Sequence, residues 1–371
     1  MDIIKEFINT ISAPQIIFPV ILLVFFFVFP PTNRMLAINR KLGINKIWTN
    51  TGGIVLFVLI FVSFIFGLTD PNFFLIVTKP DNVPIVGLLF LVVFFLWFTM
   101  KQGHDNDLRI SEGKKPIEAE DSKEKVLVWP DLVYIEFIAL ILCTVLLIVW
   151  SILLHAPLEE PANPTVSPNP SKAPWYFLGL QEMLVYFDPW IAGVLFPTVI
   201  IIGMMAIPYI DNNKKGNGYY TFADRKMAIS IFMFFWLILW IFLITIGTFL
   251  RGPNWNFFGP FEYWDIGKLE ALTNVNISEI FYMIWLKQRL PSNILLRELP
   301  GFIIVLSYFG IMPLLLAKTL FKKIYNNLGA FRYSVYTILL LMAVSLPIKM
   351  MLRWFFNIKY IIAIPEFFFN I

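Results

Sequence analysis

The sequence predicts an all-α integral membrane protein with about eight transmembrane helices, and three observations carry that prediction. The chain has 371 residues, of which 58% are hydrophobic and only 15% charged, and its mean hydropathy is +0.74. A soluble domain carries far more charge than this. Several long apolar runs come close to the roughly 20 residues that a helix needs to cross a bilayer. None of these runs alternates as a membrane strand would.

The predicted spans follow one another along nearly the whole chain. Several of them contain proline within the run, at positions that membrane helices tolerate as kinks. These prolines include Pro197, Pro208, Pro313 and Pro347. The eight runs are 13–31, 52–69, 82–100, 131–154, 189–210, 227–249, 300–317 and 335–352. We expect the first run to be a retained span, because it is too long and too poor in flanking positive charge for a cleaved signal peptide.

Positive charge is concentrated on one set of connections. Of the 29 Lys and Arg residues, 18 lie in segments 32–50, 101–129, 211–226 and 318–334. By the positive-inside rule these connections are cytoplasmic, and both termini lie outside. The net charge of +4 is too small and too scattered for a nucleic-acid partner. No eukaryotic transit segment is recognisable, so we expect a bacterial energy-transducing membrane.

The pattern divides the chain into five regions. An N-terminal extension of three spans is followed by a charged cytoplasmic linker. Next come a three-span domain, an aromatic outer connection, and a C-terminal extension of two spans. Their predicted bounds are 1–100, 101–127, 128–250, 251–299 and 300–371.

The segment SPNPSKAPWYFLGLQEMLVYFDPW, residues 167–190, is unusual for a membrane loop. After its prolines, Trp175, Tyr176 and Phe177 stand side by side, and we call these three residues with Pro174 the aromatic ledge. One carboxylate, Glu182, follows among leucines. An acid in such surroundings is desolvated, which favours its neutral form and suits it to exchange protons.

Four motifs in order carry a resemblance to a known family. They are PDLVYI (130–135), LEEPANP (158–164), APWYF (173–177) and IPYID (207–211). In sequence and predicted sidedness they resemble the C-terminal half of cytochrome b, and most closely subunit IV of the cytochrome bf complexes. The resemblance covers residues 126–250. It implies a non-haem-ligating subunit of a quinol–cytochrome c reductase that translocates protons and is not active alone.

The resemblance places the aromatic ledge in the wall of a quinol-oxidation site on the outer, proton-releasing face. A quinone head group is flat and apolar with two oxygens, so an aromatic slot with a few polar groups suits it. The family's PEWY motif is altered, because its glutamate is replaced by Pro174. We therefore expect Glu182 to be the proton acceptor. The alternative is that Glu182 only pairs with a basic residue of a partner subunit.

The family's haems need four histidine ligands, and this chain has two, His104 and His155. The predicted topology places them on opposite sides of the membrane. No metal site is therefore predicted here, and the b-type haems are expected on a separate chain that corresponds to the N-terminal half of cytochrome b. The resemblance further implies a Rieske iron–sulfur protein, a c-type cytochrome and membrane lipid as partners.

Two other classes of function stay open from the residues alone. A transporter would place paired charges or broken helices within the membrane. Only one clear acid, Glu136, falls within the predicted spans, and we identify no lysine deep in a run. A purely structural anchor would use the aromatic ledge only as part of an interfacial belt.

Overall fold

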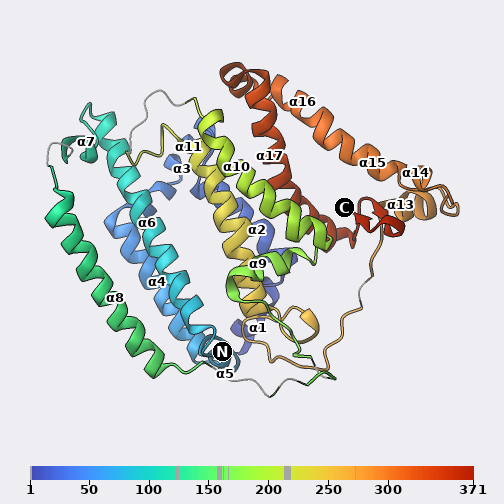
Figure 1. Ribbon diagram of the computed structural model, residues 1–371, viewed down its shortest axis with the longest axis horizontal. Coiled ribbons are helices and arrows are strands. Elements are labelled where there is room, and N and C mark those ends of the chain that lie inside the picture. The colour runs from blue at the N-terminus through green and yellow to red at the C-terminus, as the bar shows by residue number, and fades with distance from the viewer. Residues whose placement is uncertain are drawn as a thin grey trace.

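The computed structural model describes residues 2–121, 125–156, 161, 163–165, 167–212, 219–271 and 273–371. It is a helical protein whose long helices lie side by side in an irregular, open bundle (Figure 1). This architecture confirms the predicted all-α membrane fold. The only strands among the described residues are β1 (Ala363–Ile364) and β2 (Phe369–Asn370), which pair antiparallel near the end of the chain.

Among the described residues, seven helical stretches are long and apolar enough to cross a membrane, and a bent pair makes a possible eighth. The bent pair is α1 (Asp2–Ile11) and α2 (Pro14–Val28), which meet at 75°. These positions agree with the eight runs predicted from the sequence. The other seven stretches are α4 (Asn50–Leu68), α6 (Val83–Ser111), Val128–Leu153, Ile191–Ile210, Lys226–Leu250, Leu299–Lys318 and α17 (Lys322–Phe356).

Several of these spans are composite. The third to sixth contain α8 (Val133–Leu153), α10 (Phe196–Ile210), α11 (Lys226–Met233) with α12 (Phe242–Thr245), and α15 (Leu299–Leu306) with α16 (Met312–Lys318). Wider, π-helical turns fill the remainder, at Val128–Leu132, Ile191–Leu195, Phe234–Ile241, Ile246–Leu250 and Ser307–Ile311. Two of them come directly before Pro197 and Pro313, because a proline lacks the N–H that a regular helix would use.

Short elements complete the chain outside the spans. They are α3 (Asn33–Lys41), α5 (Pro71–Val77), α7 (Ile117–Asp121), α9 (Trp175–Met183), α13 (Ile277–Glu279) and α14 (Ile294–Arg297). Caps fix several starts. Asp70 Oδ1 accepts hydrogen bonds from the backbone of Asn72 and Phe73 before α5, and Thr49 Oγ1 accepts one from Gly52 before α4.

The connections rich in Lys and Arg lie at one end of the bundle. In Figure 1 α3, α7, the start of α11 and the junction of α16 with α17 are all toward the top, whereas α1 and α5 are at the bottom. This arrangement places the positively charged connections on a common side.

One hydrophobic core joins the two terminal extensions to the central spans. Phe18 of α2 is fully buried, with its ring centroid 5.4 Å from that of Phe242 on α12 and 5.3 Å from that of Trp354 on α17. Tyr186, just after α9, also meets Trp354, at 5.6 Å. Because these aromatic rings interlock, the extensions are part of the framework that positions the segment around α9.

Two details differ from the sequence interpretation. Helix α6 continues to Ser111 and so takes up the first part of the segment expected to be a solvated linker. Lys349 lies within the last span and is 1% exposed, so there is a buried lysine in a run where we identified none. Its Nζ donates a hydrogen bond to the carbonyl oxygen of Ile371, at 3.2 Å.

Candidate functional site

The aromatic ledge forms the first turn of α9, and its side chains are exposed on the surface of the protein. Pro174 occupies the N-cap position, with φ −50° and ψ 146°, which leads an extended chain into the helix. Trp175, Tyr176 and Phe177 are 37%, 47% and 51% exposed. Their rings form a continuous cluster, with centroid distances of 5.7 Å between the first two and 4.7 Å between the last two. The predicted ledge is therefore an accessible aromatic surface.

The chain that leads into α9 is held by hydrogen bonds on both sides. The Gln181 side chain accepts a bond from the backbone N–H of Ala173 and donates one to the carbonyl oxygen of Ser171, both 2.8 Å long. Asn169 and Asn254 are joined by two further bonds, of 2.9 and 2.6 Å. The entry loop thus rests on the segment after the Lys226–Leu250 span, which confirms that these two connections lie on the same side.

The other face of α9 packs closely against the Lys226–Leu250 span. A Cβ atom added at Gly179 would lie 3.1 Å from Cδ1 of Trp240 and 3.5 Å from Cγ1 of Ile244. At Gly247 an added Cβ would lie 3.4 Å from the carbonyl oxygen of Leu178. Since a larger residue at Gly179 must displace Trp240, the glycine fixes the distance between the short helix and the span.

Glu182 lies on this buried face and forms an ion pair with Arg251. Its carboxylate has no exposed surface and accepts hydrogen bonds from Nε and Nη2 of Arg251, at 3.0 and 2.8 Å. The hydroxyl of Tyr186 donates a third bond, 3.0 Å long, to Oε1. Arg251 also donates from Nη1 to the carbonyl oxygen of Trp255, at 2.9 Å. Two charge-assisted hydrogen bonds and one hydroxyl donor therefore satisfy this buried carboxyl group within the chain.

Burial and the neighbouring charges shift the pKa values of Arg251 and Tyr186, the two groups that bond to Glu182. Burial works to lower the pKa of Arg251, but the charge of Glu182 and then Tyr186 outweigh it, so the net pKa is raised. Burial, followed by the charge of Glu182, raises the pKa of Tyr186 well above its ordinary value. Arg251 is therefore a permanent cation and Tyr186 a neutral hydroxyl.

Lys172 adds a half-buried amine near the pair. Its Nζ donates to the carbonyl oxygen of Thr248, at 2.8 Å, and lies 4.8 Å from the ring centroid of Trp264. Burial lowers the pKa of Lys172 to about 7, and the charges of Lys79 and Arg251 act in the same direction, whereas Glu182 opposes them. An amine with such a pKa can gain or lose a proton near neutral pH.

The outer connection folds back on the site and on the N-terminal extension. Phe258 is fully buried, and the Nζ of Lys268 lies 4.4 Å from its ring centroid. The backbone N–H of Phe261 donates to Oδ1 of Asn9 on α1, at 2.8 Å, and its carbonyl oxygen accepts from Asn72 on α5, at 3.2 Å. The segment 251–265 is thus held against α1 and α5 of the N-terminal extension.

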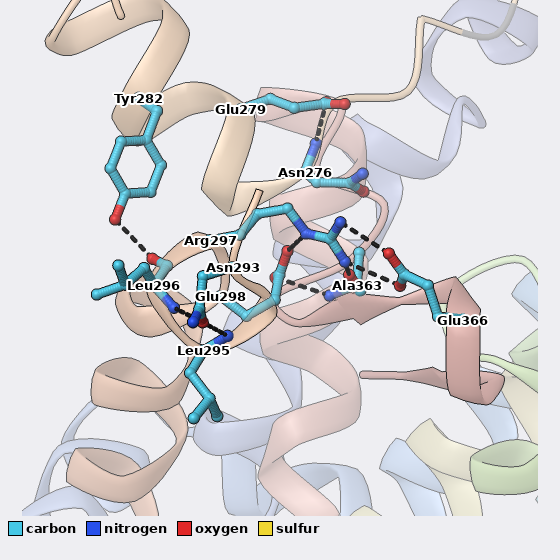
Figure 2. Close-up of polar contacts among 10 residues, drawn as sticks. All are labelled: Asn276, Glu279, Tyr282, Asn293, Leu295, Leu296, Arg297, Glu298, Ala363 and Glu366. Carbon is cyan, nitrogen blue, oxygen red and sulfur yellow. Dashed lines mark hydrogen bonds and ion pairs between the residues drawn. The ribbon is translucent and has the colours of Figure 1, made fainter. Parts of the chain in front are cut away.

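A separate group of polar contacts ties the last part of this connection to the end of the chain. Figure 2 shows Arg297 between two carboxylates. It donates to Glu298 at 3.1 Å and forms two bonds to Glu366, each 2.9 Å long. Glu298 is buried and accepts a bond from the backbone N–H of Ala363, at 2.9 Å. This outer clamp (Arg297, Glu298, Ala363 and Glu366) joins β1 to the start of α15.

The clamp continues on the other side of Arg297, again in Figure 2. The hydroxyl of Tyr282 donates to the carbonyl oxygen of Leu296, at 2.6 Å. Asn293 caps α14 by accepting bonds from the backbone of Leu295 and Leu296. Because the guanidinium of Arg297 and the carboxylates of Glu298 and Glu366 all have partners within the chain, the clamp holds the outer connection in place.

Residues 161–260 match the family model described as Cytochrome b (C-terminal)/b6/petD. The chain carries a cytochrome b C-terminal domain. This confirms the family inferred from the motifs, and the domain holds the aromatic ledge, Glu182 and Arg251 together. Proteins with this domain belong to quinol–cytochrome c oxidoreductase complexes of the bc and b6f types. No solved structure matches the chain.

The matched segment and the motif resemblance overlap without coinciding. PDLVYI, at 130–135, lies before the matched cytochrome b domain and begins α8. Most of LEEPANP, at 158–164, lies outside the described residues, so the structure gives no view of that motif. The match also extends past residue 250, through the arginine that pairs with Glu182.

The two histidines of this chain do not fit the ligand positions that the haems of the family require. His104 lies on α6 and lines a pocket with Arg40 and Asp107, whereas His155 is exposed after the end of α8. Since α8 crosses back from the side where α6 ends, the two imidazoles cannot meet at one iron (Figure 1). Within the ranges that the structure describes, no three His, Cys, Asp or Glu side chains gather in a way that could hold a metal ion.

Proposed function

We propose that this chain completes the quinol-oxidation site on the outer side of a complex of the bc or b6f type. The aromatic ledge supplies one wall of the site, and a quinol ring lies against Trp175, Tyr176 and Phe177. One electron then goes to a Rieske cluster and the other to haems on a sister chain, while the protons leave on the outer side. The chain has no quinol-oxidising activity without those partners.

The observation that carries this proposal is the joining of an exposed aromatic surface to a buried charged group within one short helix. The three ledge rings are accessible, and the same helix bears Glu182 two turns later. A flat apolar ring with polar oxygens binds well to an aromatic wall that has polar groups close behind it. An interfacial belt alone would not require a fully buried carboxylate in its supporting helix.

Glu182 is proposed as the proton acceptor in place of the family's glutamate, whose position is Pro174. The structure adds a constraint on that role, because the carboxylate already accepts two hydrogen bonds from Arg251. Glu182 has no exposed surface, so accepting a proton from quinol requires Arg251 to move off the carboxylate. In the alternative interpretation Glu182 has only a structural role, as half of an ion pair. Its basic partner is then Arg251 of this chain and not a residue of a partner subunit.

The haems are proposed to lie on a partner chain, with the Rieske protein docking near the outer connection. Helix α8 supports a place in a larger assembly, because none of its residues is buried against the rest of the chain. A tag on this chain should therefore recover a complex whose reduced-minus-oxidised spectrum contains a b-type haem signal. A colourless preparation that still holds its native partners would contradict the proposal.

The role of Glu182 is tested by comparing two variants in the purified complex. Glu182→Gln removes the acceptor but leaves Arg251 buried without its counter-ion, so a loss of activity alone is ambiguous. The double variant Glu182→Gln/Arg251→Gln removes both charges. If Glu182 accepts the proton, the double variant stays slow in quinol oxidation even when its stability is restored. Quinol oxidation at the wild-type rate in either variant would refute the role.

A further inference from the structure

A pocket with both polar and apolar lining residues lies at the opposite end of the bundle from the aromatic ledge. It has a volume of about 270 Å³ and is formed by α2, α3, α6 and the chain just before α11. In Figure 1 these elements come together near the top, at the end that carries most of the positive charge. Its floor is apolar, with Trp48, Met100 and Phe222 all buried. We call it the inner-end pocket.

The rim of the inner-end pocket carries opposite charges, on Arg40 and Asp107, that attract each other without forming a contact ion pair among the described residues. Arg40 and Asp107 both line it, and no ion pair joins them within the described part of the chain. His104 and Asn45 add polar groups. A ligand that fills this pocket therefore meets one cation and one anion on the rim, above an apolar floor.

The walls of the pocket are fixed by hydrogen bonds between its elements. Asn39 donates from its side chain to the carbonyl oxygen of Phe27, at 2.7 Å, which ties α3 to α2. Asp107 accepts a bond from the backbone N–H of Ala223, at 2.9 Å, which ties α6 to the start of α11. Asn106 donates to the carbonyl oxygen of Tyr220, at 3.0 Å, beside it. The pocket is preformed, as small-molecule sites usually are.

We propose that the inner-end pocket binds the head group of a zwitterionic phospholipid, with the chemistry of phosphoethanolamine. The guanidinium of Arg40 suits a phosphate, to which it can donate paired hydrogen bonds. The carboxylate of Asp107 faces the backbone N–H groups of Ala223 and Phe222 and still keeps lone pairs that suit a primary ammonium. The apolar floor accommodates the start of the acyl chains. The volume is small for a complete ligand, which fits a head group whose tails run along the membrane.

This assignment predicts discrimination between lipids that share a phosphate. A phosphoglycerol head has no ammonium for Asp107, and a phosphocholine head has an ammonium with no N–H to donate. Native mass spectrometry of the purified complex, stripped of lipid and titrated with each of the three phospholipids, measures the binding directly. We expect one retained phosphoethanolamine lipid per chain, bound about tenfold more tightly than either competitor.

Two variants and a matched control separate the contributions of Arg40 and Asp107 to lipid binding. Arg40→Gln should weaken all three lipids, whereas Asp107→Asn should abolish the preference for phosphoethanolamine while retaining an acceptor for Ala223. The ratio between lipids is measured in one sample, so a general loss of folded protein does not change it. Asp105→Asn serves as the control, because Asp105 pairs with Lys101 and does not line the pocket.

Equal affinities for the three lipids in the wild-type protein would overturn the proposal. The same holds if Asp107→Asn and Asp105→Asn give the same lipid ratio as the wild type. Recovery of a bound quinone in place of a phospholipid, displaced by Arg40→Gln, would also overturn it. None of these results depends on quinol oxidation at the aromatic ledge.

Discussion

Glu182 on α9 and Arg251 at the end of the Lys226–Leu250 span are 69 residues apart in sequence and are joined by two hydrogen bonds in a buried site. Their contact fixes the short helix of the aromatic ledge against the span that follows it. The ion pair therefore bears on the stability of the protein and on the proposed transfer of a proton to Glu182.

The first prediction concerns the ion pair as a structural element. Arg251→Gln should lower the free energy of unfolding by about 3–5 kcal/mol, because it leaves the Glu182 carboxylate buried without its counter-ion. The double variant Glu182→Gln/Arg251→Gln should recover most of that loss, since two amides can bond to each other. Thermal unfolding of the complex in detergent, followed by tryptophan fluorescence, measures both. A double variant less stable than either single variant would contradict this account of the pair.

The second prediction concerns the aromatic ledge. Tyr176→Ala and Phe177→Ala should raise the KM for quinol several-fold with little change in stability, because both rings are substantially exposed and support little of the core. Steady-state reduction of a c-type cytochrome by quinol, in the purified complex, gives the KM. Tyr263→Ala is the control, since Tyr263 is an exposed tyrosine of the outer connection outside the ledge. If all three variants change the KM for quinol equally, the aromatic ledge is not part of the quinol site.

The third prediction follows from the lowered pKa of Lys172. Its pKa is about 7 in the folded protein against an ordinary value of 10.5, so between these values the unfolded state binds more protons. Stability should therefore rise as the pH increases from about 7 toward 10, and the Lys172 contribution should be constant below that window. Lys172→Met should flatten this rise in a series of melting curves, whereas Lys287→Met, at an exposed site, should retain it. A rise that persists unchanged in Lys172→Met would show that another group causes it.

The fourth prediction concerns the close contact of α9 with the span behind it. Gly179→Val should destabilise the protein by about 1–3 kcal/mol, because the added atoms overlap Trp240 and force a shift. The same shift should move the aromatic ledge, so the KM for quinol should rise along with the loss of stability. Gly193→Val is the matched control, since nothing lies within 4 Å of a Cβ added there. A fully active and stable Gly179→Val variant would contradict the proposed packing constraint.

Much of the fold was predictable because long apolar runs have few alternatives to spanning a membrane. The bend between α1 and α2 was missed, although Pro14 directly after Ser12 and Ala13 is a recognisable helix start. The extension of α6 to Ser111 was also missed, because a solvated charged segment and a helix that packs through Gly103 and Asn106 look alike in composition.

The aromatic ledge could be located from its motif, but its polar surroundings could not. Glu182 stands alone among apolar residues, which marks it in the sequence, but nothing there shows that its partner lies in the same chain. Arg251 directly follows an apolar run and was a visible signal, yet only the tertiary packing of α9 on that span brings the two charges together. Lys172 reaches Thr248 through the same packing, which sequence spacing does not reveal.

The most direct test of the central claim is photolabelling of the intact complex with an azido-quinone, followed by peptide mapping of this chain. If the aromatic ledge forms part of the quinol-oxidation site, the label should fall on the peptide that contains Trp175, Tyr176 and Phe177, and excess quinol should suppress it. Label confined to other chains or to other peptides of this one, with the complex fully active, would contradict the claim.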